Sequence, residues 1–355
     1  MKKLICFICA AALTLLSGCS GGSIYTNYRE IEQLMVIQTM GFDKSPEGIT
    51  LSVSTGNSGG GTSSGSTTAR MSASAKTISL AQDRLRDYSA SEELFFAHTS
   101  YIAIGEACAR EGLTPFLDYI SRSVSLREGT PIFIVVGDDA KALVLGAGNK
   151  DYDATNVLKS LERNIKLRGD LQVFTAADIS ANLNRRGACL ITAISCAKSK
   201  DVIEGAADDE LTAIPAGYAV IINGKMAGVI DLNAARGVSI LKNELKSSYT
   251  ELHADGQTVA LLLDKCGCKI DGKNREINVK LSATLAEAVG DPQNDSLDRA
   301  LEKEARAWIN AALDAVSEYG CDFIGIEKPG YTSYIINVSA EVGRSFDIEN
   351  TEGEE

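Results

Sequence analysis

Histidine is almost absent from this chain: there are two in 355 residues, and tryptophan occurs once. A catalytic histidine needs a nucleophile, an acid or a metal beside it, and a histidine-rich metal site needs more histidines than these. His98 follows two phenylalanines in "LFFAHTSYIAIG", which predicts a packed, hydrogen-bonded strand residue. His253 lies in the polar stretch "YTELHADGQ", which predicts a surface loop.

Other signatures of chemistry are missing as well. There is no GxSxG elbow and no GxxxxGK[ST] phosphate loop. Cys266 and Cys268 form a lone CxC pair, whereas structural zinc needs a second pair or added histidines. The acidic pairs Asp138-Asp139 and Asp151-Tyr152-Asp153 are too short for a calcium loop and predict solvated turns. We therefore predict no catalytic residue, no metal site and no cofactor.

Positive charge is scarce relative to negative charge. The chain has 35 Lys and Arg against 47 Asp and Glu, a formal net charge of -12. Such a surface repels phosphate backbones, so we predict no nucleic-acid partner, and it gives no overall attraction to anionic lipid. The length predicts two or three domains, and a hydrophobic content of 45% is enough for a sizeable core.

The N-terminus supplies a different route to a membrane. Two lysines precede the apolar run Leu4–Leu16, which is shorter than the roughly 20 residues that span a bilayer but typical of a signal peptide. The following "LSGC" resembles a bacterial lipobox, which implies cleavage between Gly18 and Cys19 and diacylation of Cys19. We therefore predict a signal peptide at 1–18 and a lipid-anchored tether at 19–28, because two acyl chains hold a protein stably on a bilayer.

The cysteines leave two alternatives open. Cys6 and Cys9 depart with the signal peptide, and Cys19 takes the lipid. The others are disulfide-bonded or free thiols, since an exported protein allows both but their density is low for a disulfide scaffold. These residues are Cys108, Cys189, Cys196, Cys266, Cys268 and Cys321.

Short apolar strands alternate with amphipathic helices over residues 29–200, the rhythm of α/β units. We predict that the middle of 29–44 is a helical turn leading into a strand, which forms a hairpin with 48–56. The Gly/Ser/Thr-rich segment 54–68 predicts a flexible loop, either an extended hairpin tip or a disordered insertion. The further predicted strands are 101–105 and 131–137. The predicted helices are 76–90, 113–123, 154–169 and the end of 171–187. The first of these has Ile78, Ala81, Leu85 and Tyr88 on one face, and the second has Pro115 in its first turn.

A polar linker at 201–210 separates a second region, 211–345. We predict that it opens with a β-hairpin turning at Asn223-Gly224. A helix at 232–245, strands at 258–270, 276–290 and 334–342, and a disordered acidic tail at 346–355 complete it. The strongest predicted helix is 301–320, with an apolar stripe of Ala305, Trp308, Ile309, Ala312, Leu313 and Val316 and a C-cap at Gly320.

Four stretches in this order resemble the Ger(x)C family, the lipoprotein C subunits of bacterial spore-germination nutrient receptors. They are the lipobox with "REIEQLMVIQTMGFDKSPEGITLSV", then "AKTISLAQDRLRDYSASEELFFAHTSYIAIGEACAREGLTPFLDYISRS", then "AGYAVIINGKMAGVID", and finally "DAVSEYGCDFIGIEK" with "INVSAEVGRSF". The resemblance implies a mixed α/β and α+β, multi-domain protein with mixed β-sheets flanked by helices. Residues 29–200 would form one or two structural domains and 211–345 another.

The resemblance also implies a function. The chain would be a non-enzymatic subunit on the outer face of the spore inner membrane or the cell membrane. Its partners would be the membrane, through the lipid anchor, and polytopic A- and B-type receptor subunits. The alternative is a substrate-binding lipoprotein that feeds a transporter. A surface hydrolase is disfavoured by the missing triad and metal signatures.

Overall fold

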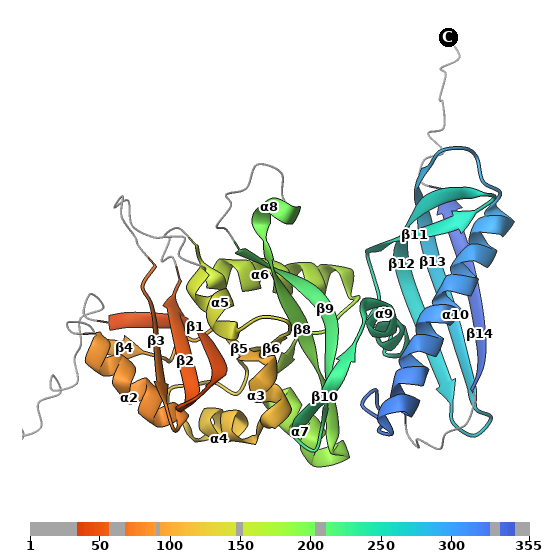
Figure 1. The fold of residues 1–355 in the computed structure, drawn as a ribbon. Coiled ribbons are helices and arrows are strands. Elements are labelled where there is room, and N and C mark those ends of the chain that lie inside the picture. Colours follow the sequence, from red (N-terminus) through yellow and green to blue (C-terminus); the bar gives the residue numbers. More distant parts are fainter. Residues whose placement is uncertain are drawn as a thin grey trace, which may run out of the picture.

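The structure is a computed structural model, and it forms two β-sheets flanked by helices (Figure 1). This confirms the predicted mixed fold class. The predicted signal peptide, the tether with Gly18 and Cys19, and the acidic tail lie outside the described residues. The described ranges are 34–56, 68–89, 93–146, 152–202, 211–326 and 334–344.

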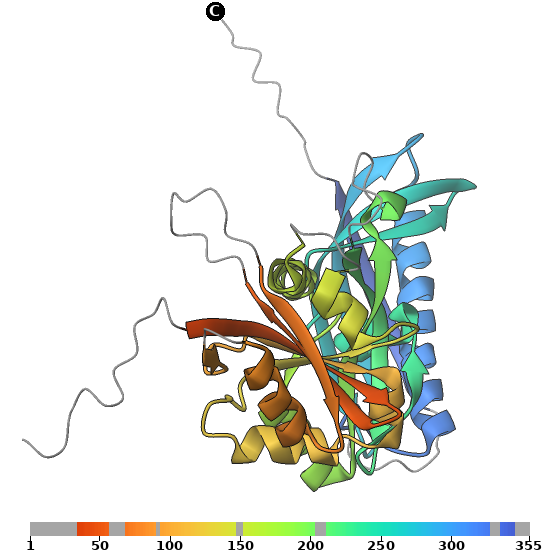
Figure 2. The same cartoon turned by 60° about the vertical axis from the view of Figure 1, so that its left-hand side comes forward.

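The first sheet has ten strands. The main order is β10-β9-β8-β6-β5-β1-β2-β3, with β4 beside β1 and β7 beside β6. The four strands β1, β5, β6 and β8 run parallel at its centre, where continuous apolar runs are buried on both faces. Figure 2 shows its twist from another side. The strands are β1 (Leu34–Ser45), β2 (Gly48–Thr55), β3 (Arg70–Ala75), β4 (Glu93–Phe95), β5 (Tyr101–Gly105), β6 (Pro131–Val135), β7 (Phe174–Thr175), β8 (Ala188–Lys198), β9 (Leu211–Ile222) and β10 (Lys225–Ile230).

Helices lie on both sides of this sheet (Figure 1). The helices predicted from periodicity are confirmed, but on α2 the predicted apolar face is wrong at one residue: Tyr88 is 61% exposed because it ends the helix beyond the sheet contact. The helices are α2 (Ile78–Tyr88), α3 (Glu106–Glu111), α4 (Thr114–Arg122), α5 (Ala140–Leu145), α6 (Ala154–Arg168), α7 (Ala176–Arg186) and α8 (Ser199–Val202).

The hairpin of β9 and β10 belongs to this first sheet. It turns at Asn223 and Gly224 as predicted, both with positive φ. However, β9 is paired with β8 along nearly its whole length, from Ala188 opposite Ile222 to Lys198 opposite Leu211. The sequence predicts that this hairpin opens the second region. Its alternation and turn predict that its two strands pair with each other, but do not say which sheet they extend.

The second sheet has the order β11-β12-β13-β14, with β14 parallel to β13 after the crossing of α10. Helices α9 and α10 cover one of its faces (Figure 1). On α10 the predicted stripe is confirmed at its centre, where Trp308 is 2% exposed, and Leu313 and Val316 are half-buried. Gly320 ends the helix with φ 61°, as predicted. The elements are α9 (Leu232–Leu241), β11 (Ser248–Ala254), β12 (Gln257–Asp271), β13 (Glu276–Ala288), α10 (Asn294–Tyr319) and β14 (Ile335–Arg344).

Three strands, β3, β8 and β11, are not predicted from the sequence. The small and polar residues of β3 and β11 hide their alternation, and the apolar run of β8 lacks a clear period. The Gly/Ser-rich segment joins β2 to β3, which are paired from Ile49 opposite Ala75 to Ser54 opposite Arg70. Residues 57–67 of that connection lie outside the described ranges. No helix within those ranges combines the length and apolar character needed to cross a bilayer.

Candidate functional site

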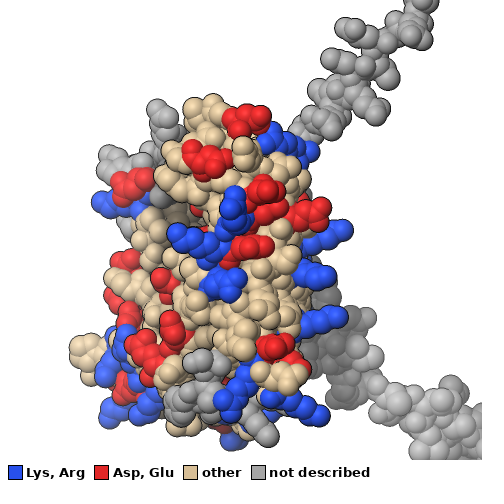
Figure 3. Space-filling model, turned by 90° about the vertical axis from the view of Figure 1, so that its right-hand side faces the viewer, with Lys and Arg blue, Asp and Glu red and all other residues tan. Residues whose placement is uncertain are grey.

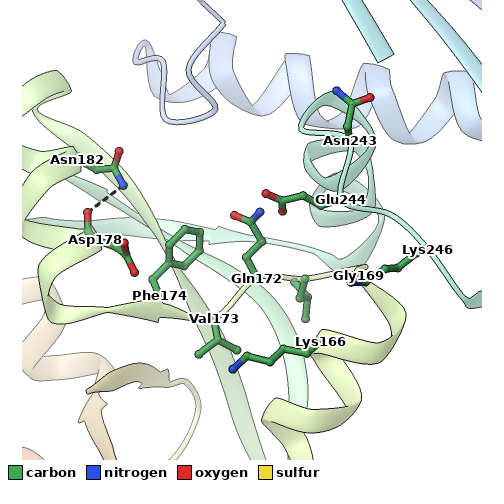
Figure 4. A pocket seen from close by; sticks show the side chains of 11 residues that line it. Lys166, Gly169, Gln172, Val173, Phe174, Asp178, Asn182, Asn243, Glu244 and Lys246 are labelled. Atoms are coloured by element: carbon green, nitrogen blue, oxygen red, sulfur yellow. Dashed lines mark hydrogen bonds between the residues drawn. The ribbon is translucent and has the colours of Figure 1, made fainter. Parts of the chain in front are cut away.

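A cavity of about 660 Å³ lies where the loop after α6 meets the segment that follows α9 (Figure 4). Its size is in the range of small-molecule sites. The lining therefore comes from both regions of the sequence, on either side of the predicted linker. The polar and aromatic groups that define it are Lys166, Gln172, Phe174, Asp178, Glu244 and Lys246.

Gly169 lets these two segments approach each other. It ends α6 with φ 65°, a left-handed conformation that favours glycine. A Cβ at this position would overlap the carbonyl oxygen of Glu244. The contact continues as a backbone hydrogen bond, in which the N–H of Lys246 donates to the carbonyl of Arg168 at 3.1 Å. Gly169 therefore allows the close approach of the two segments that line the cavity.

Two half-buried charged residues, Lys242 and Glu244, lie close together here, and Glu244 lines the cavity. The ammonium of Lys242 lies 5.6 Å from the ring centre of Phe174 and 3.4 Å from Gln172 Oε1. Burial lowers the pKa of Lys242 and raises the pKa of Glu244, and each charge partly offsets the shift of the other. In Figure 4 the carboxyl group of Glu244 points toward the amide of Gln172. Its Oε2 atom is buried and has no hydrogen-bond partner among the described residues.

The charged groups around the cavity are partly engaged with their neighbours. Lys166 is paired with Glu162 at 2.6 Å, and Asp178 forms a capping box with Thr175 at the start of α7. The described lining offers amides, carboxylates and ammonium groups. The cavity can hold polar groups through hydrogen bonds and charge.

Replacing Glu244 with glutamine should change how stability depends on pH. The carboxyl has a raised pKa in the folded chain, so its contribution is present below the unfolded pKa of about 4 and is lost as pH rises through the folded value. Glu244→Gln should therefore be more stable than wild type at pH 7, by at most about 1 kcal/mol because solvent at the cavity mouth screens the charge. The gain should vanish near pH 4.

Urea unfolding at several pH values measures this difference. Glu287→Gln, at an exposed position of β13, is the matched control and should follow wild type throughout. Equal stability of Glu244→Gln and wild type at pH 7 and pH 4 would show that burial does not penalise this carboxylate.

Arg236 joins α9 to the second sheet. Its guanidinium lies 4.8 Å from the ring centre of Trp308 on α10, a cation–π contact. It also donates to Thr250 Oγ1 at 3.3 Å and to Ser248 Oγ at 3.4 Å on β11. Burial lowers the pKa of Arg236, and the carboxylate of Asp170 opposes that shift. The residue therefore links α9, α10 and β11 at the second sheet.

Asn243 pins the segment after α9 to β12. It has φ 59°, and its side chain both accepts from the N–H of Cys268 and donates to the carbonyl of Cys268 at 3.2 Å. Beside it, Cys266 Sγ donates to the carbonyl of Ile240 at 3.8 Å. The CxC pair thus lies on β12 against α9. The backbone of Cys268 is hydrogen-bonded to Asn243, and the thiol of Cys266 is hydrogen-bonded to Ile240.

The sequence does not reveal the structural role of Asp43, which caps the start of α5. It lies on β1, and its two carboxylate oxygens accept from the N–H groups of Ala140 at 2.8 Å and Lys141 at 2.6 Å, at the start of α5. Burial raises its pKa although both hydrogen bonds oppose the shift. Asp139 stands at the N-cap position of α5 but makes no cap bond with its side chain. Because Asp43 and Ala140 are 97 positions apart, no local pattern announces their contact.

The two histidines lie apart from the cavity. The prediction for His98 is wrong: it is an exposed turn residue after β4, 5.6 Å from the ring of Phe95, because the chain leaves the sheet before it. The buried polar residue there is Thr99, which donates to the carbonyl of Phe96 at 2.8 Å. His253 is on the surface as predicted, but in strand β11 rather than in a loop.

The six cysteines in the described ranges are free thiols. Burial raises the pKa of Cys108, Cys189, Cys196 and Cys266 to about 12. A thiol with such a pKa stays protonated and unreactive at neutral pH.

Of the two acidic pairs, one described residue, Asp153, acts as a helix cap. Asp153 caps α6 by accepting from the N–H of Thr155 at 2.8 Å. Within the described parts of the chain, no group of three or more His, Cys, Asp and Glu residues is placed to hold a metal ion.

Comparison with known proteins gives the class: this is a spore-germination protein. A family model described as the spore germination protein N-terminal domain matches residues 27–195, and one described as spore germination B3/GerAC like, C-terminal, matches residues 216–335. The structure titled "Crystal Structure of the GerBC protein" superimposes with a TM-score of 0.53 and 14% identity, over 85% of this chain and 96% of the other. No curated protein matches by sequence.

The two matches together cover most of the chain. The chain therefore belongs to the Ger(x)C family and is a germinant-receptor subunit of the C type, which confirms the resemblance seen in the sequence. Subunits of this type are components of membrane-associated receptor complexes.

Proposed function

We propose that this chain is a lipid-anchored, non-enzymatic subunit of a nutrient-germinant receptor. It acts by assembling with polytopic A- and B-type subunits or by transmitting the binding signal to them. The observation that carries the proposal is the match of both halves of the chain to spore-germination families. The apolar run Leu4–Leu16 and the lipobox-like "LSGC" before them support the lipid anchor. The division into 1–18, 19–28, 29–200, 201–210, 211–345 and 346–355 is part of this proposal.

The anchor would make weak contacts sufficient. Two acyl chains confine the protein to the outer surface of the membrane, which raises its effective concentration near membrane-embedded partners. An interface too weak to hold in solution would then remain occupied.

The contacts that the segment after α9 makes with β12 and with the end of α6 support a receptor subunit over a substrate-binding lipoprotein. A binding lipoprotein closes its lobes around a ligand through a hinge that absorbs changes in φ and ψ. Here the segment after α9 is held by Asn243 to β12 and by Lys246 to the end of α6. These contacts favour a body that moves as one unit against a partner.

Loss of the anchor should reproduce loss of the subunit. Spores carrying Cys19→Ala and spores lacking the gene should both release dipicolinic acid more slowly than wild type in response to one class of nutrient. Cys321→Ala, a substitution of a free thiol in the folded part, should behave as wild type. A non-nutrient trigger such as a long-chain alkylamine should act equally on all strains.

If the deletion and Cys19→Ala both match wild type for every nutrient, the receptor proposal fails and transport becomes the hypothesis to test. If the deletion slows release but Cys19→Ala does not, the subunit works without a lipid anchor.

A further inference from the structure

The second sheet ends in a long strand whose outer side meets α10. Within the described part of the chain, β14 pairs with β13 on one side and has no strand on the other. It is ten residues long and contains no proline. Its β-branched residues, which favour strand pairing, are Ile335, Ile336, Val338 and Val342. An edge of this kind presents a row of N–H and C=O groups to which another extended chain can bind.

Two carboxylates of α10 bind to this outer edge. Asp298 Oδ1 accepts from the N–H of Val342 at 2.8 Å, and Glu302 Oε1 accepts from the N–H of Ala340 at 3.2 Å. Both acidic residues are half-buried, so water competes with these bonds only in part. Two of the N–H groups that a further strand would need are therefore already bonded.

The same line of α10 side chains continues beyond the two carboxylates. Arg306 donates to the carbonyl of Ile336, and Arg344, at the end of β14, donates to Asn294 Oδ1 at 2.9 Å. Figure 1 has α10 and β14 at its right-hand end, and Figure 3, seen from that side, shows acidic and basic side chains interspersed over the upper middle of this face. The α10 residues in these contacts recur at every fourth position, and we call them the α10 row: Asn294, Asp298, Glu302 and Arg306.

The spacing of the α10 row matches the spacing of the strand. Four residues of a helix advance by about 6 Å along its axis, and two residues of a strand advance by about 6.6 Å. The step from Asp298 to Glu302 therefore covers nearly the same length as the step from Val342 to Ala340. Because α10 and β14 run in opposite directions, one side of the helix reaches successive outward-facing groups of the strand. The side chains of the helix thus occupy the place of a neighbouring strand.

We infer that the α10 row keeps the edge of β14 from pairing with the same edge of a second copy of this chain. Two copies of one strand can pair antiparallel about a two-fold axis, because each offers the same outward-facing groups. An incoming strand would have to displace both carboxylates from the N–H groups, and hydrogen bonds to a charged group are among the strong ones.

The inference goes beyond the proposed function, but it has a consequence for it. Two acyl chains on each copy would confine all copies to one membrane surface and so raise the effective concentration at which their edges meet. A closed β14 edge would then leave the subunits free to bind their membrane-embedded partners. The test below needs no anchor, so its result is independent of the state of Cys19.

A fluorescent peptide with the sequence of residues 335–344 measures access to this edge. Its anisotropy, titrated with the full mature chain in detergent, gives the affinity. The chain with Asp298→Ala and Glu302→Ala should bind the peptide at least about a hundredfold more tightly than wild type, because each lost charge-assisted bond opposes pairing by a factor of ten or more. Light scattering after gel filtration should also show that this double variant forms dimers or larger species more readily than wild type.

A matched pair of acidic residues on the same helix provides the control. Asp314 and Glu318 have the same residue types and the same four-residue spacing as Asp298 and Glu302, but they are exposed. The chain with Asp314→Ala and Glu318→Ala should bind the peptide as wild type does. Unchanged emission of Trp308, which is buried on α10, shows that a variant keeps its fold.

Equal affinity of the peptide for wild type and for the Asp298→Ala, Glu302→Ala chain overturns the inference, because the two carboxylates then do not control this edge. So does an equal gain in affinity for the control pair, which would make the effect one of net charge. If the double variant does not fold, each single alanine variant should still bind the peptide about tenfold more tightly than wild type. Wild-type affinity in both single variants would again overturn the inference.

Discussion

Valine in place of Gly237 should lower the free energy of unfolding by about 3 kcal/mol or more. Gly237 lies in α9 where this helix crosses α10, and a Cβ there would overlap the backbone carbonyl of Trp308 and press on Ala312. Neither atom can move aside cheaply, because both belong to the buried face of a long helix. The helices would have to separate, which exposes the apolar contact between α9 and α10.

The single tryptophan makes the measurement local. Because Trp308 is the only tryptophan, its fluorescence reports the α9–α10 contact directly. We expect a red-shifted emission and an earlier urea midpoint for Gly237→Val. Gly272→Ala is the control, since a Cβ there meets nothing within 4 Å, and it should stay within about 0.5 kcal/mol of wild type. Unchanged emission and midpoint for Gly237→Val would mean that the helices do not cross so closely.

Alanine in place of Asp43 should cost about 2 to 4 kcal/mol. The substitution leaves the N–H groups of Ala140 and Lys141 without their acceptors at the buried start of α5, and each such loss costs about 1 to 3 kcal/mol. Relief of the buried carboxylate offsets part of this. Thermal unfolding of Asp43→Ala, compared with wild type, measures the net effect.

Asp139→Ala is the matched control for this experiment. A sequence-based choice of N-cap for α5 would select Asp139, but its side chain makes no cap bond. We expect a change below about 0.5 kcal/mol at Asp139. Equal effects at Asp43 and Asp139 would contradict the assignment of the cap to β1.

The elements that the sequence predicts correctly are those whose signal is local. Helix α10 is defined by its apolar stripe and by Gly320, and the β9–β10 turn by Asn223-Gly224. Strands β5 and β6 are continuous apolar runs. In each case the residues that make the pattern also make the structure, so periodicity and turn chemistry suffice.

Features that depend on distant residues were not predictable. The cap of α5 comes from β1, the cavity is lined by two segments about 70 residues apart, and the hairpin of β9 and β10 joins an edge formed earlier in the chain. His98 shows the opposite error, because its aromatic neighbours indicated packing while the chain had already left the sheet. In these cases the position of a residue depends on contacts with distant parts of the chain, and the local sequence does not encode those contacts.

The pairing of β8 with β9 also bears on how such subunits can be recombined. A chimera joined within 201–210, between the two family matches, would bring a foreign β9 and β10 against the native β8, an eleven-residue strand with an apolar, buried inner part. A mismatched partner there leaves an open strand edge, which invites aggregation. Paralogues should therefore exchange their carboxyl-terminal parts successfully after Ile230. This residue ends β10, so a junction there leaves every strand of the first sheet with its native partner.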